Sequence, residues 1–156
     1  QYAGKTGDLG TEYENVSALL YALDLSYNKD FSSIKGDIRL IGQFSSVNIS
    51  DAYYLNDSMN VAMGEDSLYT FNNQSTVYYA QLSYRPSKSG KELIRSLEFV
   101  VRYDAAQLAE GAKWEFDDAR WSLGLSYWIH ARSAFKFEMR IGKLENIAML
   151  QWTIGF

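Results

Sequence analysis

The sequence has no cysteine, and it has only one proline and one histidine among its 156 residues. Without cysteine it forms no disulfide framework, binds no metal through thiolates and carries no thiol nucleophile. Its formal net charge of −4 argues against a nucleic-acid partner. No apolar run approaches the roughly 18 residues of a transmembrane helix. The chain shows no signal peptide and does not begin with Met, so we expect it to be processed or to be part of a longer protein.

Apolar and polar residues alternate along much of the sequence. In residues 146–156, every second position is apolar, and small, amide or flexible residues lie between Ala148, Leu150, Trp152, Ile154 and Phe156. Side chains of a strand alternate between its two faces, so this pattern predicts a strand with one apolar face. Its length matches the roughly 9–11 residues that a tilted strand needs to cross a bilayer.

Six further segments alternate in the same way: residues 16–28, 34–45, 76–85, 95–104, 119–129 and 133–142. The intervals 1–15, 46–74 and 105–117 are predicted loops, the last with a short helical turn at 105–110, because they are rich in polar, glycine or helix-forming residues. Gly4, Gly7 and Gly10 argue against an eighth strand within residues 1–15. The sequence therefore predicts a single all-β domain over residues 1–156, with seven antiparallel strands.

The two faces of these strands differ in polarity. The apolar face has no charge at its centre, whereas the opposite face has charges at mid-strand. Aromatic residues lie near strand ends on the apolar face, at Tyr27, Tyr84, Tyr103, Trp121 and Tyr127. A soluble sandwich or lipocalin-like barrel with outward polar positions also alternates. The placement of aromatics and charges favours an antiparallel transmembrane β-barrel in the lipids of a Gram-negative outer membrane.

Two sets of residues follow from this assignment. The residues predicted to face lipid are Leu123, Leu125, Phe135, Phe137, Trp152, Ile154 and Phe156. The residues predicted to line a pore are Lys35, Asp37, Arg39, Arg85, Glu98, Arg102, Arg120, Lys136, Glu138 and Arg140. Ion pairs in the lumen explain the carboxylates of Glu98 and Glu138 more simply than acid–base catalysis does.

Connection lengths predict the orientation. If Phe156 is periplasmic, the intervals 46–74 and 105–117 and the turn 142–146 fall outside the cell, and the turns 28–33 and 130–132 and the segment 86–94 fall in the periplasm. Two of the three outer connections are long, as bacterial barrels prefer. Closing seven strands would force two parallel edge strands to pair, and an unpaired edge in lipid costs several kcal/mol per backbone group. We therefore expect this chain to be one portion of a barrel of about 14–18 strands.

Four segments resemble strands of the phosphate-selective porin O/P family. Residues 79–86 (YAQLSYRP) resemble its YxQxxYRP strand, and residues 97–104 (LEFVVRYD) resemble its LEPVVRYD strand. Residues 121–128 (WSLGLSYW) are similar to its LGLNYW strand, and residues 150–156 (LQWTIGF) to its closing strand. The order and spacing agree over residues 76–156, which would be the C-terminal half of such a porin. The resemblance implies an outer-membrane channel, commonly trimeric, that passes anions such as phosphate through a basic lumen.

The mixed charges of the predicted lumen depart from that basic pattern, so two functions stay open. One is a porin-like channel for passive diffusion of small charged solutes, including anions such as phosphate. The other is a non-conducting β-barrel subunit, a structural component of a larger outer-membrane complex. Neither is an enzyme, and neither requires a cofactor or a metal.

Catalytic and metal chemistry find little support in the sequence. His130 lies in a predicted tight turn beside Arg132, without spacing that would bring a serine and a carboxylate to it. Oxygen-bearing residues within 56–66 leave calcium binding open, although their spacing does not match an EF-hand. The sequence has no glycine-rich phosphate loop with a lysine.

Overall fold

The computed structural model describes residues 2–6, 16–50, 54–55, 68–69, 71–112 and 115–155. Eight of its strands form one sheet: β1 (Tyr2–Thr6), β2 (Val16–Phe31), β3 (Gly36–Ile49), β6 (Gln74–Arg85), β7 (Leu97–Leu108), β8 (Phe116–His130), β9 (Ser133–Gly142) and β10 (Asn146–Ile154). A separate antiparallel pair consists of β4 (Tyr54–Leu55) and β5 (Leu68–Tyr69). The helical elements of the described chain are the 3-10 turn η1 (Ser32–Ile34) and the one-turn helix α1 (Glu92–Arg95).

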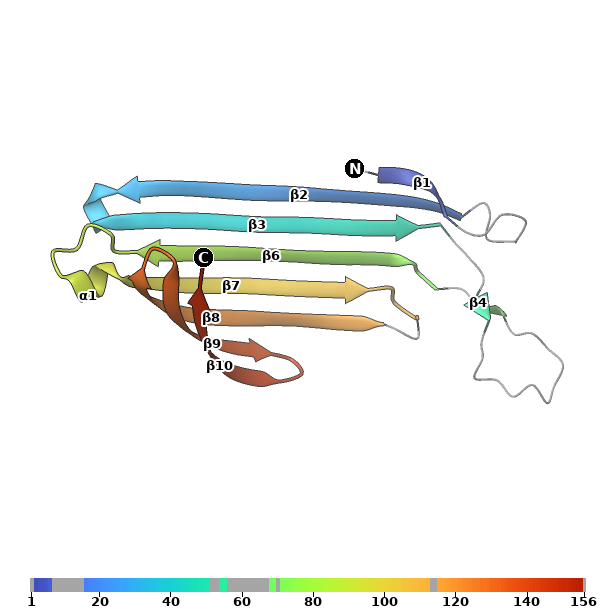
Figure 1. Ribbon diagram of the computed structural model, residues 1–156. Coiled ribbons are helices and arrows are strands. Elements are labelled where there is room, and N and C mark those ends of the chain that lie inside the picture. The colour runs from blue at the N-terminus through green and yellow to red at the C-terminus, as the bar shows by residue number, and fades with distance from the viewer. Residues whose placement is uncertain are drawn as a thin grey trace. The chain divides into compact units, whose positions relative to one another are not determined.

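The long strands form an antiparallel meander in which each strand of the sheet pairs with the next one along the chain (Figure 1). The order is β1-β2-β3-β6-β7-β8-β9-β10, and among the described residues no pairing joins β1 to β10. This chain by itself therefore does not close the sheet into a barrel. The all-β, antiparallel prediction is confirmed, and the seven predicted strands correspond to β2, β3 and β6 to β10.

Contacts divide the chain into two compact units. One consists of Gln1–Ala22, Ser45–Thr76 and Ala106–Asp117, and the other of Leu23–Phe44, Val77–Ala105 and Asp118–Phe156. The first unit holds a small apolar cluster of Phe71, Ala109 and Ala112. The second unit holds all of β9 and β10 together with α1, and every functional feature described below except one polar hollow lies within it.

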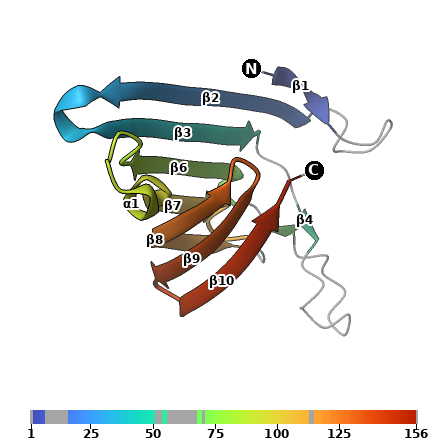
Figure 2. The same cartoon turned by 60° about the vertical axis from the view of Figure 1, so that its left-hand side comes forward.

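The C-terminal strands are two successive hairpins (Figure 2). A two-residue turn, Ala131 and Arg132, joins β8 to β9, as the sequence predicts. The register then pairs Ser133 with Ile154 and continues without interruption to Ile141 opposite Asn146. The β8–β9 pairing is regular from Arg120 to Trp128 and shifts register between Trp128 and His130. Over the regular stretches, the pairing fixes which side chains of the three strands share a face.

Several strands are longer than the alternation predicts. β3 continues to Ile49, β7 continues to Leu108, and β8 begins at Phe116. The interval 105–117 is therefore strand at both ends, and the predicted helical turn at 105–110 is wrong. Small and polar residues have low strand propensity, but pairing with a neighbouring strand overrides it.

The structure also corrects the prediction that residues 1–15 are entirely loop. β1 pairs with β2 from Tyr2 opposite Leu20 to Thr6 opposite Val16, and Gly4 lies within it. Gly weakens a strand but does not remove its backbone donors and acceptors. Because β1 covers only the first residues of the edge, β2 has no strand partner on that side from Ala22 to Phe31 within the described part of the chain.

The second predicted strand begins two residues later than expected. Ser32–Ile34 form the 3-10 turn, and Lys35 closes it in the left-handed region at φ 51° while its N–H donates to the Ser32 carbonyl. At Gly36 an added Cβ would collide with the Arg85 carbonyl oxygen, so β3 and β6 approach too closely there for a side chain. The predicted strand position of Lys35 is therefore wrong, because Lys35 lies in the turn before β3.

Candidate functional site

The candidate site is built on the polar face of β7, β8 and β9. The register pairs small residues of β8 with long charged residues of β9: Ser126 with Lys136, Gly124 with Glu138, and Ser122 with Arg140. Both serines are buried beneath their neighbours. The alternation of the two strands thus places short side chains beside long ones and leaves open space above β8.

A hollow of about 420 Å³ opens on this face. Seven of the ten predicted pore residues line it: Arg39, Glu98, Arg102, Arg120, Lys136, Glu138 and Arg140. Asp104, Gln81 and Trp128 also line it. Of the remaining predicted residues, Asp37 lies on β3 outside this lining, and Arg85 lies over the Trp128 ring, 5.7 Å from its centroid.

Asp104 holds two arginines of different strands in the hollow. Arg102 precedes it by two residues on β7, and the Arg102 Nε donates to Asp104 Oδ1 at 2.7 Å. Arg120 of β8 approaches the other carboxylate oxygen, with Nε to Oδ2 at 4.0 Å. The Arg102 guanidinium also lies over the Tyr79 ring of β6, 4.3 Å from its centroid. One carboxylate therefore fixes cationic groups that would otherwise repel each other.

Two further carboxylates are partnered in the same hollow. On β9, Arg140 Nε donates to Glu138 Oε1 at 2.7 Å, again between residues two apart on one strand face. On β7, Glu98 accepts a hydrogen bond of 2.8 Å from the indole Nε1 of Trp128. These partners follow from strand register, so the alternation alone could predict the shared face but not the individual contacts.

Cations outnumber anions in this hollow. Its lining includes the cations Arg39, Arg102, Arg120, Lys136 and Arg140, and the anions Glu98, Asp104 and Glu138, which gives a formal charge of +2. The whole chain has −4. Across the described residues, no carboxylate pairs with Arg39 or Lys136. The hollow therefore offers unneutralised positive charge to a small solute.

The opposite face of the same strands is apolar and exposed. The predicted lipid-facing residues Leu123, Leu125, Phe135, Phe137, Trp152 and Ile154 are all exposed, and Phe156 lies outside the described residues. Exposure reaches 78% at Leu150 and 71% at Leu23. Phe137 also borders the hollow, where its carbonyl oxygen lies close to Gly124. A soluble protein rarely exposes so large an apolar surface unless the surface contacts a partner or a membrane.

Aromatic rings on the exposed face form a row across four strands. Ring centroids are 6.5 Å apart between Phe44 and Tyr78, 6.1 Å between Tyr78 and Tyr103, and 4.9 Å between Tyr103 and Trp121. These residues belong to β3, β6, β7 and β8 in that order, so the row runs across the strands. Beyond it, the β3 positions on the same face as Phe44 are Ser46 and Asn48, whereas Val47 and Ile49 lie on the opposite face. The row therefore marks where the apolar stretch of these strands ends.

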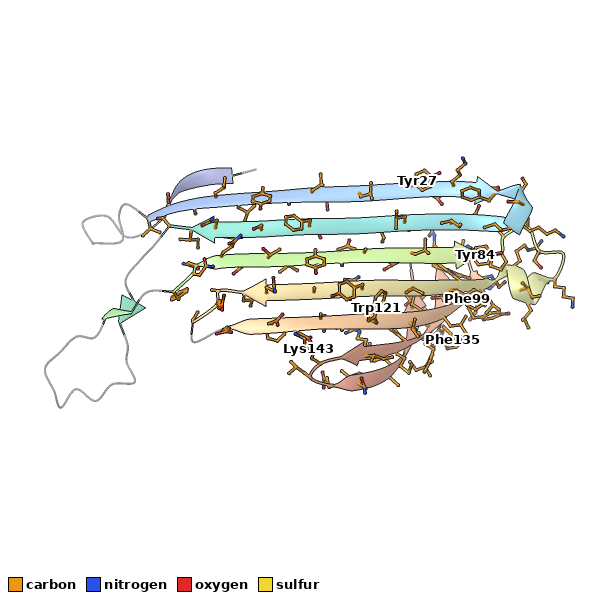
Figure 3. All side chains as sticks on the ribbon, turned by 180° about the vertical axis from the view of Figure 1, so that it is seen from behind. Tyr27, Tyr84, Phe99, Trp121, Phe135 and Lys143 are labelled. Atoms are coloured by element: carbon orange, nitrogen blue, oxygen red, sulfur yellow. The ribbon has the colours of Figure 1, made fainter. Side chains whose placement is uncertain are left out.

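Other aromatics lie toward the opposite strand ends. Figure 3 shows Tyr27 and Tyr84 near the ends of β2 and β6. Phe135 and Trp152 stack on neighbouring strands with centroids 5.7 Å apart, and Trp152 Nε1 donates to Ser133 Oγ at 3.2 Å. The Tyr84 hydroxyl donates to the Ile34 carbonyl at 2.7 Å, so the polar groups of Tyr84 and Trp152 are hydrogen-bonded near strand ends, as amphipathic aromatics at an interface require.

The described residues contain no group of side chains suited to catalysis by His130 or to metal binding. His130 is exposed at the end of β8. Among the described residues, no three His, Asp or Glu side chains gather to hold a metal ion, and the oxygen-rich interval 56–66 lies outside them. A second hollow, of about 400 Å³, lies in the first unit and has polar lining such as Asn72, Gln107 and Glu110. No helix in the described ranges is long and apolar enough to cross a membrane.

A comparison with protein families, with characterised proteins and with solved structures finds no match to this chain. The likeness to phosphate-selective porins therefore stays a hypothesis that rests on the four strand segments.

Proposed function

We propose that this chain is part of an outer-membrane β-barrel and forms a porin-like channel for the passive diffusion of small charged solutes. The main support is the segregation of its side chains. Long apolar residues are exposed on one face of the sheet, and charged residues gather around a hollow on the other. A bilayer stabilises the first face, and a water-filled lumen hydrates the second.

Strand lengths and aromatic positions support the same proposal. β9 has 10 residues and β10 has 9, within the range for strands that cross a bilayer. The row of rings from Phe44 to Trp121 lies at the end of the apolar stretch, where an interfacial girdle belongs.

The open edges of the sheet favour a barrel larger than this chain. From Ala22 to Phe31 the edge of β2 has no strand partner among the described residues, and β10 has none beyond β9. In hydrocarbon, each unpaired backbone group costs several kcal/mol, so both edges need partner strands. We propose that further strands or other copies of the chain supply them, for example in a homotrimer or an outer-membrane complex.

The charges of the hollow suggest which solutes pass. The formal charge of +2, with no carboxylate paired to Arg39 or Lys136 among the described residues, favours small anions over small cations. The likeness to phosphate-selective porins suggests anions such as phosphate. Three carboxylates in the same hollow weaken the positive field, so the expected selectivity is modest.

Single-channel recording in a planar bilayer tests the channel. We expect stable, ohmic current steps from the folded protein, and a changed conductance in Arg102→Ala, which releases Asp104 and uncovers Tyr79. Lys143→Ala, in the exposed β9–β10 turn, serves as the control and should leave the conductance unchanged. Folded protein that inserts but gives no current would contradict the channel.

One observation favours a second function, that of a non-conducting subunit in a larger outer-membrane complex. The pairs Arg102–Asp104 and Arg140–Glu138 satisfy each other within the face, as structural ion pairs do. If this function is correct, inserted protein gives no current, and cross-linking from the β2 and β10 edges captures a different polypeptide.

A further inference from the structure

Three connections of the second unit lie at the same end of its strands and carry an excess of positive charge. They are the end of β2 with its turn (residues 29–35), the β6–β7 connection (86–96) and the β8–β9 turn (130–132). Their charged residues, all exposed, are Lys29, Asp30, Lys35, Lys88, Lys91, Glu92, Arg95 and Arg132. This set, the basic turn surface, has a formal charge of +4 (six cations and two anions), whereas the whole chain has −4 and the remainder therefore has −8.

A backbone hydrogen bond and an ion pair hold two of these connections against each other. The Lys88 N–H donates to the Lys35 carbonyl at 3.0 Å, and Lys88 Nζ lies 2.6 Å from Asp30 Oδ1. The Trp128 N–H donates to the Ser96 carbonyl at 2.8 Å and so ties the end of β8 to the segment that follows α1. The positive charges therefore belong to one structured edge rather than to unrelated turns.

Most of this positive charge is not neutralised within the described chain. Lys88 forms an ion pair with Asp30, one of the two carboxylates of this surface. The Lys29 ammonium lies over the Phe31 ring, 5.2 Å from its centroid. In the described ranges, no carboxylate pairs with Lys35, Lys91, Arg95 or Arg132. Like charges held on one edge repel each other unless an anionic partner is present.

Exposed apolar side chains accompany these cations. Leu93 of α1 is 64% exposed, and Ile94 beside it and Ile34 of the β2–β3 turn are also exposed. A surface that combines lysine and arginine with exposed aliphatic residues is suited to the boundary between phospholipid headgroups and acyl chains. The strand-end tyrosines Tyr27 and Tyr84 border the same edge on the apolar face.

We propose that the basic turn surface binds the phosphate groups of anionic phospholipids in the leaflet that this end of the strands reaches. The inference rests on the proposed function, since it requires the apolar face to lie in a bilayer. Ammonium and guanidinium groups are strong donors to phosphate oxygens. The cations are spread over three connections along the edge, which matches a plane of headgroups better than a single pocket for an acidic protein.

Lipid titration of the folded protein in a neutral detergent, read by native mass spectrometry, tests this inference. We expect phosphatidylglycerol to bind more tightly than phosphatidylcholine, and the difference to shrink at about 1 M salt, where the Debye length is about 3 Å. In the triple variant Lys35→Gln, Lys91→Gln, Arg95→Gln, phosphatidylglycerol affinity should fall about fivefold for each charge removed.

A matched control removes three positive charges from the hollow instead: Arg39→Gln, Arg120→Gln, Lys136→Gln. It should keep the preference for phosphatidylglycerol while its conductance changes, so failure of the lipid site and failure of the channel are separable. The inference would be overturned if both triple variants lost the same factor in affinity for phosphatidylglycerol, or if neither variant lost affinity. Displacement of phosphatidylglycerol from the wild type by poly-glutamate would also overturn it, because that outcome indicates an acidic protein partner. If the turn variant does not fold, the salt dependence of the wild type decides the question.

Discussion

The indole nitrogen of Trp128 donates a 2.8 Å hydrogen bond to the Glu98 carboxylate across the β7–β8 pair. Trp152, on the opposite face of the sheet, instead bonds the neutral hydroxyl of Ser133 at 3.2 Å. The two tryptophans therefore have different environments. Trp128 binds a carboxylate in the hollow, whereas Trp152 is exposed on the apolar face and binds a hydroxyl at a strand end.

Trp128→Phe removes this donor and leaves the half-buried Glu98 carboxylate without it. Hydrogen bonds to charged groups contribute about 1.5–3 kcal/mol, and we expect the free energy of unfolding in detergent to fall by an amount near the lower end of that range. Trp152→Phe is the matched control, because the Trp152 hydrogen bond is neutral and exposed. This variant should lower the free energy of unfolding by less than Trp128→Phe does. If denaturant unfolding shows the same loss of free energy of unfolding in both variants, the hydrogen bond to Glu98 contributes no more to stability than the neutral bond of Trp152.

Gly36→Ala should destabilise the sheet. An added Cβ would meet the Arg85 carbonyl oxygen, the Tyr84 ring and the Pro86 backbone, so β3 and β6 would have to separate there. Overpacking of this kind typically costs about 1–3 kcal/mol. Gly90→Ala is the control, since no atom lies within 4 Å of its added Cβ. The account of the β3 start is wrong if thermal unfolding shifts equally in the two variants.

Lys136→Glu should abolish the preference of the channel for anions. The change lowers the formal charge of the hollow from +2 to 0. Lys143→Glu makes the same change in the β9–β10 turn, outside the lining of the hollow (Figure 3). Reversal potentials in a salt gradient measure the ratio of anion to cation permeability. We expect a shift toward cations in the first variant only, and a shift of equal size in both would remove Lys136 from the pathway.

Ala80→Arg and Gln81→Arg place the same side chain on opposite faces of β6. Ala80 is exposed on the apolar face, and Gln81 lines the hollow. A charged residue on the lipid face near the middle of the bilayer destabilises a barrel by about 2–4 kcal/mol. We therefore expect Ala80→Arg to lower the free energy of unfolding in phospholipid vesicles by that amount. Gln81→Arg should have a small effect. The reverse order would indicate that the hollow, not the apolar face, is the surface excluded from water.

The sequence was sufficient to predict which residues share a face. Period-two alternation identified the seven long strands, and the exposed and hollow-facing sets of β8 and β9 follow it residue by residue. The pattern works because strand geometry is local and because only one side-chain polarity suits each face.

The alternation could not predict where strands end or which partners meet. Lys35 fits the pattern of β3, yet the 3-10 turn before it removes it from the strand. Gly4 looked like an interruption, but the edge of β2 supplies backbone partners to β1. The Asp104 contacts and the Trp128–Glu98 bond depend on register between strands, which no single strand encodes.

Spin labels on β9 test the central claim most directly, namely that the apolar face contacts lipid and the charged face contacts water. The chain has no cysteine, so Phe135→Cys, Lys136→Cys, Phe137→Cys and Glu138→Cys each give one labelled site. In phospholipid vesicles, we predict that labels at 135 and 137 collide mainly with dissolved oxygen and labels at 136 and 138 mainly with a water-soluble nickel chelate. Labels at 135 and 137 that are shielded from both, or the opposite alternation, would contradict the account.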